Sequence, residues 1–123
     1  MKAQEATQAV KGSLEALNDR IKFLVPTVVC VIEDRRVNDS SQVCASFMKT
    51  IQSDTLDLCI VLRWTGTDVM VSADLVRGGS GEVMSEMSPI KLSDQEGGEL
   101  NKLVDNIREY ISSQEDKIIQ NLR

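Results

Sequence analysis

The middle of the chain alternates between apolar stretches and short polar breaks at nearly equal intervals. Between Thr27 and Ile90, five stretches of roughly ten residues are rich in Val, Ile, Leu, Met and Cys. The breaks between them are Asn38-Asp39-Ser40-Ser41, Gln52-Ser53-Asp54-Thr55, Thr65-Gly66-Thr67-Asp68 and Gly78-Gly79-Ser80-Gly81. Short strands at this spacing, separated by turn residues, are typical of an antiparallel meander. The pattern therefore predicts a sheet region over residues 27–90.

An amphipathic helix is predicted before the sheet, over residues 3–24. Its apolar positions recur every three or four residues, which is the period of one helix face. They are Ala3, Ala6, Val10, Leu14, Leu17, Ile21 and Leu24. Gly12 weakens the helix interior by about 1 kcal/mol relative to alanine. Pro26 ends the pattern, because the residue before a proline avoids the helical conformation.

Three strands follow from the side-chain pattern inside the sheet region. Residues 27–32 are β-branched on both sides, which is typical of a strand that is covered on both faces or central in a sheet. Residues 56–64 place Leu, Ile and Trp at alternate positions, and residues 69–75 follow with the same period. The glycines of residues 78–81 allow the positive φ angles that a tight hairpin needs.

Residues 41–51 fit two structures. Val43, Cys44, Phe47, Met48 and Ile51 share one helical face, and the spacing of the residues at 39 and 42 resembles a capping box. Alternate positions of the same segment also fit one face of a strand. The even spacing of the breaks favours the strand. The sheet is therefore expected to hold five strands, or four if this segment is helical.

A second amphipathic helix is predicted at the end of the chain, over residues 94–122. Ser93 and Glu96 have capping-box spacing. The apolar positions again share one face and are Leu100, Val104, Ile107, Ile111, Ile118 and Leu122. An unbroken helix of this length measures about 40 Å, which exceeds the width of a small domain. We therefore expect either a break at Ser112-Ser113 or packing of the far end on something beyond the sheet.

Together these elements predict a single α+β domain over residues 1–123. It consists of an N-terminal helix, an antiparallel β-meander of four to five strands, and a long C-terminal helix packed on one face of the sheet. A chain of 123 residues closes one core, and 41% hydrophobic with 27% charged residues is ordinary for a soluble domain. No apolar run resembles a signal peptide or a membrane span, so we expect a cytoplasmic protein.

The three cysteines, Cys30, Cys44 and Cys59, are expected to be reduced and buried. Each lies inside an apolar stretch, their number is odd, and they lack CxxC spacing. Free cysteine behaves in protein cores as a small hydrophobic residue. In a simple meander, hairpin pairing also places Cys30 nearer to Met48 than to Cys44.

Negative charge is concentrated in the last third of the chain. The net charge is −5; residues 1–81 carry ten acids and nine bases, whereas residues 82–123 carry nine acids and five bases. Phosphate backbones require the opposite sign, so direct binding of nucleic acid is disfavoured. Electrostatic steering instead favours a protein partner with a basic surface.

No residue pattern in the chain predicts catalysis, a cofactor or a metal site. Histidine is absent, which removes the commonest general base and the commonest catalytic metal ligand. Paired carboxylates at residues 33–34 and 82–86 fall at predicted strand ends, where solvated charges are common. The run at residues 77–81 lacks the phosphate-loop pattern and precedes a strand, so it predicts a hairpin turn. We therefore expect that the protein is not an enzyme and binds no cofactor.

Two groups of residues are candidates for binding a protein partner. Trp64 and Arg63 end a strong strand, and both residue types are enriched at interface hot spots. A tryptophan that caps the core is the alternative for Trp64. Glu82, Glu86, Asp105, Glu109 and Asp116 are the acidic candidates, and the last three cluster on the far side of the predicted C-terminal helix.

The size, acidity and helix–sheet–helix layout resemble two classes of small protein. One comprises the immunity proteins that neutralise bacterial toxins, and the other the small acidic chaperones of secretion systems. The resemblance implies a protein that acts by binding, and it assigns no individual residue. We therefore expect an inhibitor or immunity protein, an antitoxin in function, that covers the active site of a basic toxin or effector. The alternative is a chaperone-like homodimer that holds a segment of a client, with the overlong last helix pairing across a twofold axis.

Overall fold

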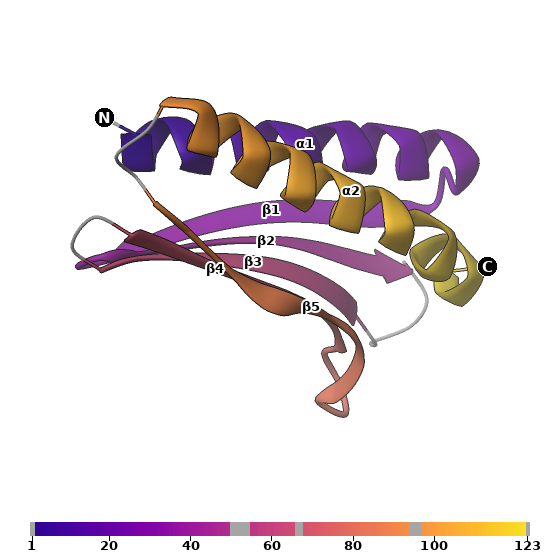
Figure 1. Cartoon of the computed structure of the whole chain (residues 1–123). Helices are drawn as coiled ribbons and strands as arrows, with labels where there is room; N and C mark the ends of the chain where they lie inside the picture. The colour runs from indigo at the N-terminus through magenta and orange to yellow at the C-terminus, as the bar shows by residue number, and fades with distance from the viewer. Residues whose placement is uncertain (1, 50–54, 66–67, 94–96, 123) are drawn as a thin grey trace.

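The chain folds into a two-layer structure of helices on one face of a sheet (Figure 1). The computed structural model describes residues 2–49, 55–65, 68–93 and 97–122. The elements follow in the order α1 (Lys2–Leu24), β1 (Val28–Val37), β2 (Ser40–Lys49), β3 (Thr55–Thr65), β4 (Asp68–Arg77), β5 (Glu82–Ser93) and α2 (Gly97–Leu122). This arrangement confirms the predicted α+β class.

The five strands form one antiparallel meander in the order β1-β2-β3-β4-β5. The segment that fitted both a helix and a strand is strand β2. Tight turns join β1 to β2 and β4 to β5, where the sequence supplies suitable residues. Asn38 has a φ of 54° between β1 and β2, and Gly81 has a φ of 75° before β5. The predicted breaks at 52–55 and 65–68, like the capping box at 93–96, lie partly outside the described residues.

The core lies between the two helices and one face of the sheet. Alternate residues of β2, β3 and β4 are fully buried there, with Phe47, Leu58, Ile60 and Leu75 at 0% exposure. The apolar stripe of α1 packs on the same face through Ala6, Val10, Leu14, Leu17 and Ile21. Strand alternation and helix periodicity thus bury complementary surfaces, and each buried Leu or Ile contributes about 1.5–3 kcal/mol.

Helix α2 is continuous through Ser112 and Ser113, so the predicted break is absent. Its far end is buried within the chain, because Ile118 and Leu122 are 0% and 4% exposed. The strands are ten to twelve residues long, so the sheet extends about 33–40 Å and matches the helix. The domain is therefore longer than its residue count suggested, and the length of α2 does not require a second copy of the chain. The side chain of Leu100 lies outside the described residues.

Candidate functional site

The two helices cover only one face of the sheet and leave the other face without a layer (Figure 1). We call this second side the uncovered face; it consists of the strand side chains that alternate with the buried ones. On β3, for example, the positions between Leu56, Leu58 and Ile60 are half-buried, although no helix lies over them. None of the described helices or strands therefore covers this face of the sheet.

One line of register partners crosses the uncovered face from edge to edge. Glu33 of β1 lies opposite Cys44 of β2, which lies opposite Cys59 of β3. Cys59 lies opposite Asp74 of β4, which in turn lies opposite Glu86 of β5. We call these five residues the central row. It places three carboxylates around a pair of sulfur atoms in the middle of the sheet.

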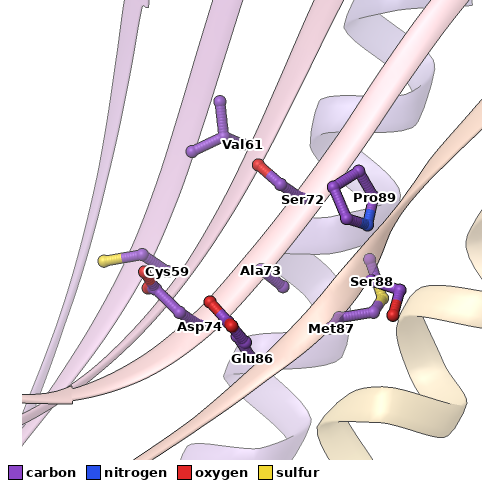
Figure 2. Close-up of a pocket in the computed structure, with 9 residues that line it drawn as sticks. All are labelled: Cys59, Val61, Ser72, Ala73, Asp74, Glu86, Met87, Ser88 and Pro89. Atoms are coloured by element: carbon purple, nitrogen blue, oxygen red, sulfur yellow. The ribbon is translucent and has the colours of Figure 1, made fainter. Parts of the chain in front are cut away.

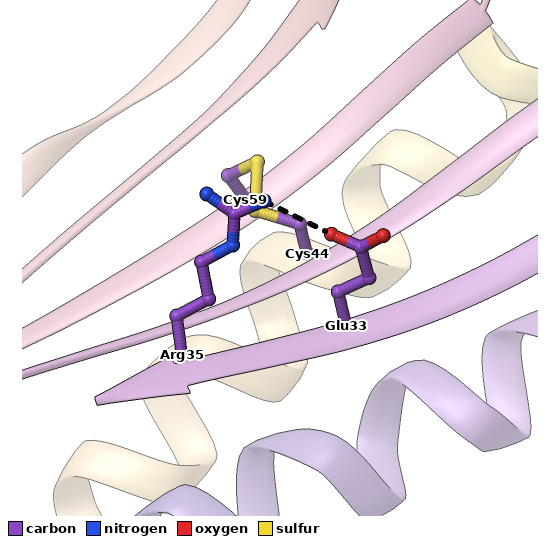
Figure 3. Close-up of a disulfide and its surroundings, with 4 residues drawn as sticks. All are labelled: Glu33, Arg35, Cys44 and Cys59. Atoms are coloured by element: carbon purple, nitrogen blue, oxygen red, sulfur yellow. Dashed lines mark ion pairs between the residues drawn. A yellow bond between two sulfur atoms is a disulfide. The ribbon is translucent and has the colours of Figure 1, made fainter.

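Cys44 and Cys59 form a disulfide in the centre of this row (Figure 3). Their Cα atoms are 4.1 Å apart, which suits directly opposed residues of a non-hydrogen-bonded antiparallel pair. The expectation of three reduced thiols was therefore wrong for these two residues. It failed because the thiols were judged by spacing along the chain, whereas the register of the β2–β3 hairpin brings them together. Cys30 remains free, as expected.

The surroundings of Cys30 differ from those of the disulfide. Cys30 lies on the helix side of β1, opposite Phe47 and one position from Met48, as the meander predicted. Burial raises the pKa of its thiol, and the charge of Lys22 partly offsets that effect. Cys30 is therefore mostly a thiol at neutral pH. Disulfides are common in oxidising compartments and rare in cytosolic proteins, and the cytoplasmic location stays a prediction.

A hollow of about 270 Å³ lies beside the disulfide on the uncovered face (Figure 2). Its lining includes Asp74, Glu86, Ser72, Ser88 and Pro89. The register between β4 and β5 shifts between Val71 and Ala73, next to this lining. Such bulges bend a strand and re-aim its side chains, and they accommodate a proline that cannot join the ladder. The irregular strand β5 is therefore what opens the hollow.

Asp74 and Glu86 bring two like charges together at this hollow (Figure 2). Like charges directly opposite in an antiparallel pair are destabilising. Burial raises the pKa of the Asp74 carboxyl above its ordinary value, and the charge of Glu86 raises it further. The hollow therefore favours any group that adds positive charge between the two carboxylates.

Two ion pairs also lie on the uncovered face. Glu33 and Arg35 are joined at 3.6 Å beside the disulfide (Figure 3), and Asp68 and Lys91 are joined at 3.3 Å. A second hollow, of about 220 Å³, lies between the first of these pairs and the disulfide. Among the described residues, no ion pair joins Asp57, Asp74 or Glu86 to a base. The centre of the uncovered face therefore carries carboxylates without counter-ions.

The residues predicted to bind a partner do not form one surface. Arg63 and Glu86 lie on the uncovered face, Arg63 opposite Met70 and Glu86 at the hollow. Trp64 is partly buried on the helix side, where it packs against the core. Glu82 begins β5 and forms an ion pair with Arg77 at 3.5 Å. The structure thus brings only Glu86 to the unpaired carboxylates.

Asp105, Glu109 and Asp116 are exposed on α2, in the layer opposite the uncovered face. They are therefore separate from the carboxylates of the uncovered face. Sequence reasoning missed Asp57, Asp74 and the disulfide. The available signal was strand alternation, because Asp57, Cys59 and Val61 occupy the positions between buried leucines. Only the strand register, however, assigns their neighbours.

The described residues contain no group of three or more His, Cys, Asp or Glu side chains placed to hold a metal ion. Within the same part of the chain, neither helix has the length and apolar content needed to cross a bilayer.

No protein-family model, curated protein or solved structure matches the chain.

Proposed function

We propose that this protein is a protein-binding domain that takes a basic surface of its partner onto the uncovered face of its sheet. The observation that carries the proposal is the Asp74–Glu86 pair at the hollow, where two opposed carboxylates have no base among the described residues. A lysine or arginine side chain from a partner relieves their repulsion. Such a contact gains a charge-assisted hydrogen bond as well.

The remainder of the uncovered face supplies contact area around this anchor. Val61, Met70 and Val76 are half-buried there, and Val61 and the partner of Val76 each lie two positions from Cys59 on β3. Apolar groups around a charged centre suit a folded partner, because apolar contacts exclude water around a buried hot spot. The carboxylates then speed association with a basic partner, and the effect weakens as salt increases.

Inhibition is the activity that this arrangement supports best. A partner whose basic surface surrounds its active site is blocked when a sheet of this size covers that surface. This is the mode of action expected of an immunity protein or antitoxin against a bacterial toxin. It is supported by the uncompensated acids and by the resemblance in size and layout noted above. The chaperone-like alternative relies on a homodimer, for which a different part of the sheet is relevant.

A titration with a defined basic probe tests the proposed surface. A decalysine peptide is added to the isotopically labelled protein, and amide shifts are followed by NMR at low and moderate ionic strength. We expect the largest shifts at Asp74, Glu86 and their neighbours in the sheet. We also expect Asp74→Asn/Glu86→Gln to weaken the affinity by about tenfold, because two solvent-screened ion pairs of about 0.7 kcal/mol each amount to about 1.4 kcal/mol.

The matched control is Asp105→Asn/Glu109→Gln, which removes the same number of charges from the exposed side of α2. It should leave the affinity nearly unchanged. If the α2 variant weakens binding as much as the hollow variant, the probe senses only net charge. That result would overturn the assignment of the uncovered face.

A further inference from the structure

Strand β1 forms an edge of the sheet, and its outer side is exposed. The expectation that residues 27–32 are central or covered on both faces was therefore wrong, because Val29 and Val31 are 40% and 47% exposed. Among the described strands, only β2 pairs with β1. From Glu33 to Val37 every residue is exposed, and Val31 and Val37 are 47% and 66% exposed. A long edge strand with exposed apolar side chains is a ready template for pairing with another strand. We refer to this feature as the β1 edge.

The backbone polarity of the β1 edge follows from the strand register. Cys44 faces Cys59 in a non-hydrogen-bonded pair, so the backbone groups of Cys44 point toward β1, where they meet Glu33. Backbone groups alternate in direction along a strand, and those of Asp34 therefore point outward. Ile32 and Arg36 share this orientation. The β1 edge thus offers donors and acceptors at the even-numbered positions.

We propose that a second copy of this chain pairs with the β1 edge in antiparallel register, about a twofold axis through Asp34. In this register Glu33 lies opposite Arg35 of the second copy, and Arg35 lies opposite its Glu33. Val31 and Val37 pair with each other in the same way. Two opposite-charge pairs and two apolar pairs thus form at once, each in a stabilising class of cross-strand pair.

Other symmetric registers lack this complementarity. An axis through Glu33 or Arg35 places like charges directly opposite, which is destabilising. An axis through Ile32 places Val31 against Glu33 of the second copy. Charged residues on edge strands often prevent pairing. Here Glu33 and Arg35 have opposite charges on either side of Asp34. The β1 edge is therefore complementary to a second copy of itself only about the axis through Asp34.

The helix side of the strand tolerates the same axis. Asp34 faces its own copy there, but each carboxylate already has Lys11 of its own chain at 3.4 Å. Arg36 of the second copy lies diagonally opposite and adds a second positive charge. The Glu33–Arg35 pair within one chain costs little to exchange, because both side chains are more than 60% exposed.

This inference does not depend on the proposed binding function. The β1 edge lies at the opposite side of the sheet from the Asp74–Glu86 hollow, because β4 and β5 are the last two strands of the order. Pairing gives one continuous sheet with both uncovered faces on the same side. The dimer therefore presents two hollows to one partner or to two.

The test measures mass in solution by sedimentation equilibrium over a concentration range of about 1–100 μM. The 13.6 kDa chain should sediment as a dimer at the upper end. Glu33→Arg and Arg35→Glu each place like charges opposite one another, and each should weaken dimerisation at least about tenfold. An equimolar mixture of these two variants restores both opposite-charge pairs, but only between chains. The mixture should therefore form a heterodimer.

Cysteine cross-linking reads the register directly, in a Cys30→Ser background that keeps the Cys44–Cys59 disulfide. Asp34→Cys places two thiols opposite each other on the axis and should cross-link on mild oxidation. Arg36→Cys is the matched control, because two such thiols lie about 13 Å apart. Cross-linking through position 36 in place of position 34 would contradict the register. A protein that stays monomeric at every concentration would overturn the proposal. The same holds if the monomer instead binds an extended segment of another protein at the β1 edge.

Discussion

Asp74 occupies a position that the fold alone does not favour. It is half-buried between the disulfide and Glu86, and both burial and the nearby charge raise the pKa of its carboxyl. The folded protein consequently binds more protons than the unfolded chain over the interval between the two pKa values. The free energy of unfolding therefore falls as the pH rises through that interval. A functional surface accounts for such a residue more readily than stability does.

We expect Asp74→Asn to stabilise the protein at neutral pH by up to about 1 kcal/mol, because it removes a like-charge pair. The gain should shrink as the pH falls, because the raised pKa of Asp74 lets this carboxyl take up its proton and lose the like-charge repulsion. Urea unfolding at several pH values measures the difference. Asp57→Asn on the same face, opposite Ser46 and Val76, is the control and should not reproduce this pH dependence. A constant difference between wild type and Asp74→Asn would contradict the explanation.

The sequence predicted the surroundings of some residues correctly and those of others only in part. Strand alternation placed Leu58, Ile60 and Leu62 in the core, and all are 0% exposed. Cys59 alternates with them and lies half-buried on the opposite face, bonded to Cys44, although it was expected to be a buried thiol. Trp64 was identified as either a contact residue or a core cap, and its packing against the core matches the second interpretation.

At the scale of elements, β2 shows how tertiary pairing decides an ambiguous segment. Its residues satisfy a helical face and a strand face equally well in sequence. In the structure β2 has β1 on one side and β3 on the other. As a central strand, β2 offers backbone hydrogen-bond partners to both β1 and β3. A helix in its place would leave the facing backbone groups of those two strands without partners. The strand structure therefore follows from the sheet and not from the segment alone.

The disulfide joins β2 to β3 across a sequence separation of 15 residues. In the chain-entropy model, closing a loop of this length stabilises the folded state by about 3 kcal/mol. We expect a reducing agent to lower the free energy of unfolding by up to this amount. Urea denaturation with and without reductant, in a Cys30→Ser background that prevents thiol exchange, measures the effect. Identical midpoints under both conditions would show that the bond does not contribute.

At the scale of the whole molecule, the two layers distribute stability and binding to different faces. The helices and one face of the sheet bury the apolar side chains, so the uncovered face is available for polar and charged residues. Helix α2 spans the length of this core. Arg20 of α1 pairs with Glu115, and Arg77 of β4 donates to Asn121 at 3.0 Å, so the last turns contact both layers.

The far end of α2 should therefore be required for stability. Ile118→Ala removes a fully buried side chain and should cost about 2–5 kcal/mol. Asp116→Ala, two residues earlier on the exposed side of the same helix, should change stability by less than about 0.5 kcal/mol. Thermal unfolding of the two variants compares them directly. Similar melting temperatures would mean that this end of the helix does not pack on the core.

The sequence by itself determined the class of fold, the two helices, the spacing of the strands and the buried face of β3 and β4. These features depend on local periodicity, which each segment carries independently of its neighbours. Tertiary structure decided the disulfide, the continuity of α2, the Asp74–Glu86 hollow and the separation of the acidic residues into two surfaces. Those features depend on which residues of different strands lie opposite one another, and register is a property of the assembled sheet.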